Sequence, residues 1–254
     1  MFEPQNPLEH SLMKAATEPA HRAQFYRDFL ESEIFILPVG DLPEVHNGVL
    51  EAESKLSLQH IEVNGKTVLP FFTSLPRLQS VIDEEREFIK LGVRAFLEMT
   101  KGAPLLLNPG SDYGKEFFPD EVSRLLDGTI FQPSERHVVE QDTQIMLGHP
   151  AKYPTQLVES LQRLYPKQPK VRAAYLAQCF NPSRDEEPGL LVALDTAAGD
   201  WDSIVAESGI CAQGLTPDHH HVDFIQLQQS GLESYFSKTK PFYKQSVLGR
   251  LFSK

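Results

Sequence analysis

The sequence predicts an α/β (α+β) protein built from two consecutive modules. Segments with helical spacing of apolar residues alternate with strand-like segments along the chain. This pattern is lost over residues 129–143, around Gln132-Pro133-Ser134-Glu135, and 254 residues suffice for two domains of about 100–150 residues each. We therefore expect a mixed-sheet module over residues 1–130 and a second module over residues 143–254. No low-complexity linker separates them, so we expect them to pack together.

The first thirty residues are expected to form two helices. Leu8, Leu12 and Ala15 recur at helical spacing, and Pro19 opens a second helix at a first-turn position that tolerates proline. The second helix carries an apolar stripe of Ala23, Tyr26, Phe29 and Leu30. Such a stripe favours packing against a sheet.

A β-hairpin is the clearest strand signal in the first half. Alternating residues 58–63 are followed by Asn64-Gly65 and then by residues 67–72, and Asn-Gly is favoured where both turn positions need positive φ. The other elements expected in this half are a strand at 33–39, helices at 75–82 and 93–99, a short buried strand at 105–107 and a helix from Pro119 to Leu126.

The second half has the element order βαββαβ. The expected elements are strands at 143–148, 170–180, 189–195 and 222–227, with helices at 155–165 and 200–213. Residues 185–189 supply the turn between the two middle strands. This order predicts the split-βαβ, or ferredoxin-like, arrangement.

Composition excludes several classes of protein. A net charge of -11 and a pI near 5.3 argue against a nucleic-acid-binding protein held by its overall field. Only two cysteines occur, Cys179 and Cys211, which favours a reducing compartment over a disulfide scaffold. The sequence shows neither a signal peptide nor an 18-residue apolar run, so we expect a cytoplasmic protein without a membrane span.

The best candidate contact region combines two segments at strand ends. Residues 108–115, Asn-Pro-Gly-Ser-Asp-Tyr-Gly-Lys, follow a buried strand, where loops often carry function. A phosphate loop is excluded because the glycine spacing is one residue short and Glu116 stands where Ser or Thr would ligate magnesium. A structural turn and a contact loop both remain open. The binding residues that we predict are Phe72, Thr73, Ser74, Asn108, Gly110 and Ser111.

No catalytic residues, metal site or cofactor are predicted. Gly110-Ser111 lacks the G-x-S-x-G elbow. His219 and His221 could share a strand face with Asp223 as metal ligands, but they follow a solvated loop, so a structural role is favoured. Cys179 and Cys211 lack the neighbours that would activate a thiol.

The C-terminal tail is basic and aromatic. Glu233 is the last acid, and the five later cations are Lys238, Lys240, Lys244, Arg250 and Lys254. A docked C-terminus with Phe242 and Tyr243 packed on the module is one interpretation. Contact with a protein partner, and with nucleic acid or membrane, are the others.

Several segments, in order and spacing, resemble the SseB family, bacterial proteins named for enhanced serine sensitivity. These segments are residues 68–74 (Val-Leu-Pro-Phe-Phe-Thr-Ser), 105–111, 114–116 leading to Pro119, 148–150 (Gly-His-Pro), Pro154, Leu157, Leu161, 171–176 and 241–243. The resemblance covers nearly the whole chain as an N-terminal and a C-terminal family domain. It implies a bacterial cytoplasmic setting and no established catalytic residues, substrate or cofactor.

From these observations we predict a non-enzymatic interaction or regulatory protein with an unidentified protein partner. The family name suggests a link to amino-acid metabolism. The alternative is an enzyme or small-molecule-binding protein with a pocket between the modules, walled partly by residues 72–74 and 108–111. The oligomeric state does not follow from the sequence.

Overall fold

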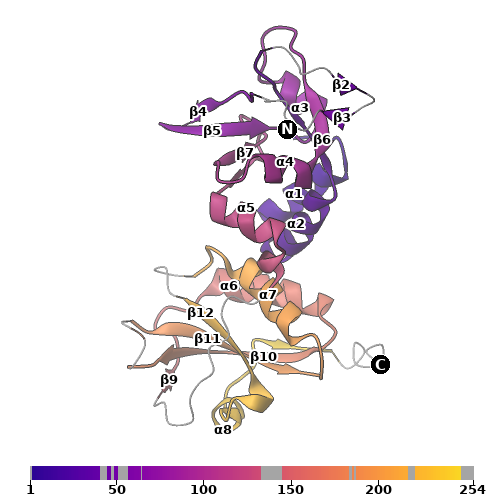
Figure 1. Ribbon diagram of the computed structural model, residues 1–254. Helices are drawn as coiled ribbons and strands as arrows, with labels where there is room; N and C mark the ends of the chain where they lie inside the picture. The colour runs from indigo at the N-terminus through magenta and orange to yellow at the C-terminus, as the bar shows by residue number, and fades with distance from the viewer. Residues whose placement is uncertain are drawn as a thin grey trace. The chain divides into compact units, whose positions relative to one another are not determined.

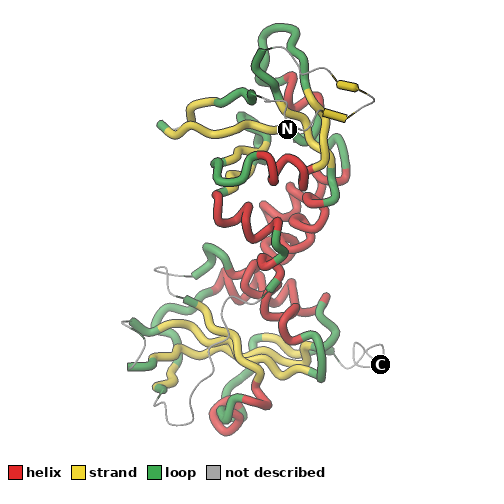
Figure 2. The backbone as a smooth tube through the Cα atoms, in the orientation of Figure 1, coloured by secondary structure: helices red, strands yellow, loops and turns green. Residues whose placement is uncertain are grey.

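The computed structural model describes residues 2–40, 45–46, 49–50, 57–63, 65–132, 145–182, 185, 187–216 and 221–246. The chain forms two compact units (Figures 1 and 2). Unit 1 contains residues 1–17 and 24–129, and unit 2 contains residues 18–23 and 130–254. The six residues 18–23 therefore belong to the unit built mainly from the second half, which the sequence did not indicate.

The two N-terminal helices form as expected. Helix α1 spans Pro7–Thr17, a short 3-10 turn η1 spans Pro19–His21 with proline in its first turn, and helix α2 spans Arg22–Leu30. The apolar stripe of α2 is buried, with Phe29 fully inaccessible. Its ring stacks on Phe117 with centroids 4.8 Å apart, which fixes α2 against a strand of unit 1.

The main sheet of unit 1 has four strands in the order β4-β5-β7-β8. They are β4 (Ile61–Val63), β5 (Lys66–Phe71), β7 (Leu105–Leu107) and β8 (Lys115–Phe117). Strands β4 and β5 form the expected antiparallel hairpin, and Gly65 in its turn has a φ of 75°. Asn64 lies outside the described residues. Strands β5 and β7 are parallel, so their carboxyl ends share one edge of the sheet.

Smaller elements complete unit 1. Strand β1 (Glu33–Ile36) pairs with β6 (Ile89–Gly92), and β2 (Val45–His46) pairs with β3 (Val49–Leu50). The helices are α3 (Leu75–Gln79), α4 (Val93–Met99) and α5 (Pro119–Leu126), and η2 covers Thr129–Phe131. Helices α4 and α5 match the prediction, α3 ends before residue 82, and β6 and β8 were not predicted. Strands β2 and β3 were not predicted either. Strands β6 and β8 are short and only partly buried, so neither carries a strong apolar run.

The sheet of unit 2 has five strands. Its path is β12-β11-β10-β13, and β9 also pairs with β10. The strands are β9 (Met146–Gly148), β10 (Val171–Phe180), β11 (Gly189–Thr196), β12 (Val222–Gln226) and β13 (Tyr243–Lys244). The remaining elements are α6 (Thr155–Leu164), η3 (Tyr165–Lys167), α7 (Trp201–Ala212), η5 (Leu227–Gln229) and α8 (Glu233–Phe236).

The α/β class and the element order of the second half are confirmed, but the ferredoxin-like arrangement is not. In a split βαβ unit, a third strand separates the two strands that flank a helix. Here β11 and β12, which flank α7, are direct parallel neighbours, and β9 pairs antiparallel with β10. The apolar periodicity of the sequence indicates the order of helices and strands. It does not indicate which strands pair, because pairing depends on contacts between residues far apart in the sequence.

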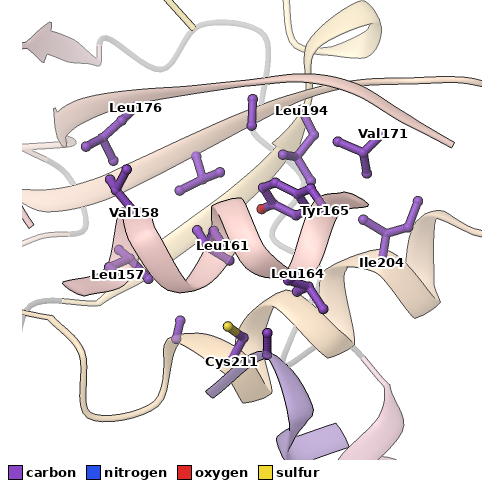
Figure 3. Packing of buried hydrophobic residues seen from close by; sticks show 14 of the residues in the cluster. Leu157, Val158, Leu161, Leu164, Tyr165, Val171, Leu176, Leu194, Ile204 and Cys211 are labelled. Carbon is purple, nitrogen blue, oxygen red and sulfur yellow. The ribbon is translucent and has the colours of Figure 1, made fainter. Parts of the chain in front are cut away.

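Helices α6 and α7 cover one face of this sheet, and α8 lies on the other (Figure 1). Leu157 and Leu161 of α6 and Tyr165 of η3 are fully buried in the hydrophobic cluster that these elements share with α7 and the strands (Figure 3). Ala20 from η1 belongs to the same cluster at 7% exposure. The core of unit 2 therefore includes a side chain from the segment 18–23.

Candidate functional site

The two segments predicted as a site meet at the carboxyl edge of the unit 1 sheet. Because β5 and β7 are parallel neighbours, Thr73 and Ser74 leave the sheet beside Asn108. The backbone N–H of Asn108 donates to the Phe71 carbonyl at 2.9 Å, and the N–H of Thr73 donates to Asn108 Oδ1 at 2.9 Å. Thr73, Ser74 and Asn108 are all buried.

A carboxylate from α1 lies at the centre of this edge. Glu9 has no exposed surface, and its Oε1 accepts hydrogen bonds from Thr73 Oγ1 at 2.6 Å and Ser74 Oγ at 2.8 Å. Its Oε2 accepts from Arg77 Nη2 at 2.9 Å and from the Gln5 backbone N–H at 2.9 Å. We name Glu9, Thr73, Ser74, Arg77 and Asn108 the polar cluster.

Sequence reasoning missed Glu9, although a signal was present. Asn6 caps α1, since its Oδ1 accepts the Glu9 backbone N–H at 2.9 Å. Asn-x-x-Glu resembles a capping box, in which a glutamate at the third helical position turns back to the start of the helix. Glu9 turns back in this way, to the N–H of Gln5.

The environment keeps Glu9 ionised. Burial raises its pKa, but hydrogen bonds from Arg77, Thr73, the Gln5 N–H and Ser74 outweigh this effect, so the pKa lies below its ordinary value of 4.5. A buried carboxylate of lowered pKa is a poor general base near neutral pH.

An N-terminal strap, residues 2–6, covers the outer side of the polar cluster. Arg77 Nη2 donates to the Glu3 carbonyl at 2.6 Å, and Asn6 Nδ2 donates to the Thr73 carbonyl at 2.8 Å. The Phe2 ring lies 3.9 Å from the Arg77 guanidinium carbon. Arg77 Nη2 thus contacts both the strap and Glu9.

The loop after β7 is a tight turn. Asn108 has a φ of 50° and Gly110 a φ of 74°, and the Ser111 N–H donates to the Asn108 carbonyl at 3.2 Å. A Cβ on Gly114 would stand 2.8 Å from the Leu107 carbonyl oxygen, so only glycine fits there without a shift. Ser111 Oγ is buried and has no hydrogen-bond partner among the described residues.

Two other predicted residues lie outside the polar cluster. Phe72 is fully buried with Leu37 and Leu78 and exchanges backbone hydrogen bonds with Phe35. A Cβ added to Gly110 would lie 4.0 Å from the Val81 side chain, which is not part of the polar cluster. The structure therefore brings together three of the six predicted residues: Thr73 and Asn108 are hydrogen-bonded directly, and Ser74 is joined to Thr73 through Glu9.

Comparisons with known proteins identify the family of this chain. Residues 8–124 match the SseB protein N-terminal domain, and residues 139–245 match the SseB protein C-terminal domain. The chain belongs to the SseB family. It is 34% identical over 249 residues to Protein SseB of Escherichia coli K12, covering 96% of this chain and 94% of that protein. Protein SseB of Shigella flexneri gives the same values. No solved structure matches the chain.

The polar cluster lies in the region that matches the SseB N-terminal domain. This region also contains an open hollow lined by residues that include Val39, His60, Leu69, Met99 and Lys101. The hollow shares no lining residue with the polar cluster, so the polar cluster does not open into it.

The histidine candidate lies in the region that matches the SseB C-terminal domain. His221 Nε2 stands 3.8 Å from Asp223 Oδ2, while His219 lies outside the described residues. Within the described ranges, no three His, Cys, Asp or Glu side chains are grouped to hold a metal ion. The described part of the chain also contains no helix long and apolar enough to cross a membrane.

Both thiols of the SseB C-terminal region are buried and form no disulfide. Burial raises the pKa of Cys211 to about 12, although Arg22 and Lys167 oppose that shift. Such a thiol is almost wholly protonated at neutral pH and is a weak nucleophile.

The tail docks through its aromatic residues, as one interpretation predicted. Tyr243 pairs with Ala174 as part of β13, and its ring centroid lies 5.5 Å from that of Tyr165. Phe242 packs against the same ring at 6.3 Å. Arg250 and Lys254 lie outside the described residues.

Proposed function

We propose that this SseB family member is a non-enzymatic interaction protein of the bacterial cytoplasm. The observation that supports this proposal is the internal pairing of the polar cluster. The hydroxyls of Thr73 and Ser74 both donate to Glu9, whose second oxygen is held by Arg77. In these contacts the hydroxyl protons are directed at Glu9 and the Glu9 oxygens accept from protein donors, so the polar cluster stabilises the resting fold.

The strap strengthens the same argument. A reacting carboxylate needs an approach path for substrate, whereas Glu9 is fully buried beneath residues 2–6. The polar cluster thus fixes α1 to the edge of the sheet. The exposed surface of the protein then performs the function by recognising a protein partner.

The experiment compares partner capture by the tagged full chain and by Ser74→Ala. Quantitative mass spectrometry identifies proteins that co-purify from bacterial lysate at moderate salt, with an unrelated tagged protein as background. The expected result is one reproducible partner set, retained by Ser74→Ala once both samples are matched for folded fraction. No reproducible partner, or turnover of a metabolite that Ser74→Ala loses while folded, overturns the proposal.

A link to amino-acid metabolism rests on the family name alone. Growth of a strain lacking this chain in medium with added serine tests the link. Growth inhibition that the wild-type chain restores supports it, and unchanged growth contradicts it. The expected pocket between the two modules stays a prediction.

A further inference from the structure

Strand β13 brings two distant basic stretches of the chain together in unit 2. Ala173 pairs with Lys244, and the Gln245 backbone N–H donates to the Arg172 carbonyl at 2.8 Å. Lys244 and Arg172 therefore come from neighbouring positions on adjacent strands. They are separated by about seventy residues in sequence, so only the fold shows that they are neighbours.

Two side-chain contacts extend this neighbourhood to α6 and η3. Gln162 Nε2 donates to the Phe242 carbonyl at 2.6 Å, and Gln245 Nε2 donates to the Pro169 carbonyl at 3.2 Å. Cations flank each contact. We give the name basic edge to the cations on the segments that these contacts join, which are Arg163, Lys167, Lys170, Arg172, Lys240 and Lys244.

The side chains of the basic edge are exposed, and acidic side chains neutralise little of their charge. All of its side chains except the partly exposed Lys170 are exposed, and neither residues 160–172 nor residues 234–246 contain an Asp or Glu. The ion pair described for this edge joins Arg172 to Asp195 across 4.0 Å, with Arg172 still 51% exposed. On a chain of net charge -11, such a region stands out as a positive surface.

We propose that the basic edge binds an extended acidic segment of a protein partner, laid along the outer side of β13. This inference rests on the proposed function and names its surface and partner class. Strand β13 ends the strand order of the sheet, and no other described strand pairs with its outer side. An added peptide strand gains main-chain hydrogen bonds there, while its acidic side chains meet Lys240, Lys244 and Arg172.

Two observations favour a peptide over nucleic acid or membrane. The aromatic rings of Phe242 and Tyr243 are partly buried against Tyr165, which leaves less of each ring to stack on bases. The exposed large apolar side chains of the described chain include none from residues 160–172 or 234–246, so the basic edge has no apolar anchor for a bilayer.

The test measures fluorescence anisotropy of a labelled peptide of alternating Glu and Ser with the full chain. The probe variant is Lys240→Gln/Lys244→Gln, and the matched control is Lys14→Gln/Lys66→Gln, which removes two exposed cations from unit 1. We expect the probe variant to raise Kd about tenfold and the control to leave it within about twofold. Binding should also weaken as salt is raised, because the charges are exposed.

Parallel titrations use a single-stranded thymidine oligonucleotide and vesicles containing anionic phospholipid. Tighter binding of either than of the peptide overturns the proposal, as does equal loss in the probe and control variants or no peptide binding. Partner capture with the probe variant separates the two proposals. A partner still captured at full yield overturns the basic edge alone, whereas peptide binding without any captured partner overturns the proposed function alone.

Discussion

Glu9 and Arg77 form an ion pair of 2.9 Å in which the carboxylate has no exposed surface and the guanidinium side chain is 18% exposed. The pair joins α1 to α3 and fixes the first helix of the chain to the edge where β5 ends. Burying a carboxylate is unfavourable unless it is paired and hydrogen-bonded, and both conditions are met here. The pair is therefore expected to contribute to folding stability.

Replacing Glu9 by glutamine should destabilise the protein by about 1–3 kcal/mol. The amide removes the charge that Arg77 faces and replaces one of the two acceptor oxygens by an NH2 donor. Urea unfolding at pH 7 measures the effect. Glu98→Gln, on the exposed side of α4, is the control and should change stability by less than about 0.5 kcal/mol. Equal effects of the two substitutions would show that the buried pair has no special role.

The same pair predicts a pH dependence. The folded pKa of Glu9 lies below its ordinary value of 4.5, so its stabilising contribution is complete above that value and is lost as pH falls through the folded pKa. The stability gap between wild type and Glu9→Gln should therefore be large at pH 7 and shrink at pH 3. Unfolding curves over this range measure the gap, and a gap that widens toward acid contradicts the assignment.

Asn108 has a left-handed backbone conformation, and its side chain both accepts and donates hydrogen bonds. Asn108→Ala should destabilise by about 2–3 kcal/mol, because it loses the acceptor for the Thr73 N–H and places a Cβ-bearing residue without a local side-chain hydrogen bond at a φ of 50°. Asn108→Gly relieves the backbone strain and should recover about 1 kcal/mol. Thermal or urea unfolding of both variants separates the two contributions; equal stability would mean that the φ value is of no consequence.

Cys211 should be inert in the folded protein and should make stability fall in alkali. Its folded pKa of about 12 exceeds the ordinary value of 9.0, so the neutral thiol stabilises the fold below pH 9 and this contribution is lost as pH rises toward 12. In a Cys179→Ala background, maleimide labelling at pH 8 should require denaturant. Rapid labelling of the native protein would disprove the burial of the thiol.

Ala20 provides a test of the discontinuous unit 2. Ala20→Asp places a carboxylate at 7% exposure among the side chains of α6 and α7 and should destabilise unit 2 by about 3 kcal/mol. Hydrogen exchange should show faster exchange of α6 and α7. Ala16→Asp, at an exposed position of α1, is the control and should leave these amides protected.

Local signals predicted most elements, because burial of one face of α2 or β10 leaves an apolar periodicity within the element itself. Strand β8 was not predicted, since Lys115 and Glu116 interrupt any apolar alternation and pairing with β7 decides its state. Apolar periodicity likewise did not predict that β12 pairs with β11. Thr73, Ser74 and Asn108 were found because strand ends are recognisable. Glu9 and Arg77 were not, because their ion pair depends on a contact across 68 residues.

The membership of residues 18–23 in unit 2 also sets an order of events during synthesis. These residues leave the ribosome before any of unit 1 beyond α1, whereas α7, which packs around Ala20, is completed only at Ala212. At about 5–20 residues per second, the early segment waits on the order of 10–40 s for its binding site. Ala20 lacks its native neighbours until α6 is made and its full set until α7 follows, so unit 1 can close around its own aromatic core while unit 2 is finished last.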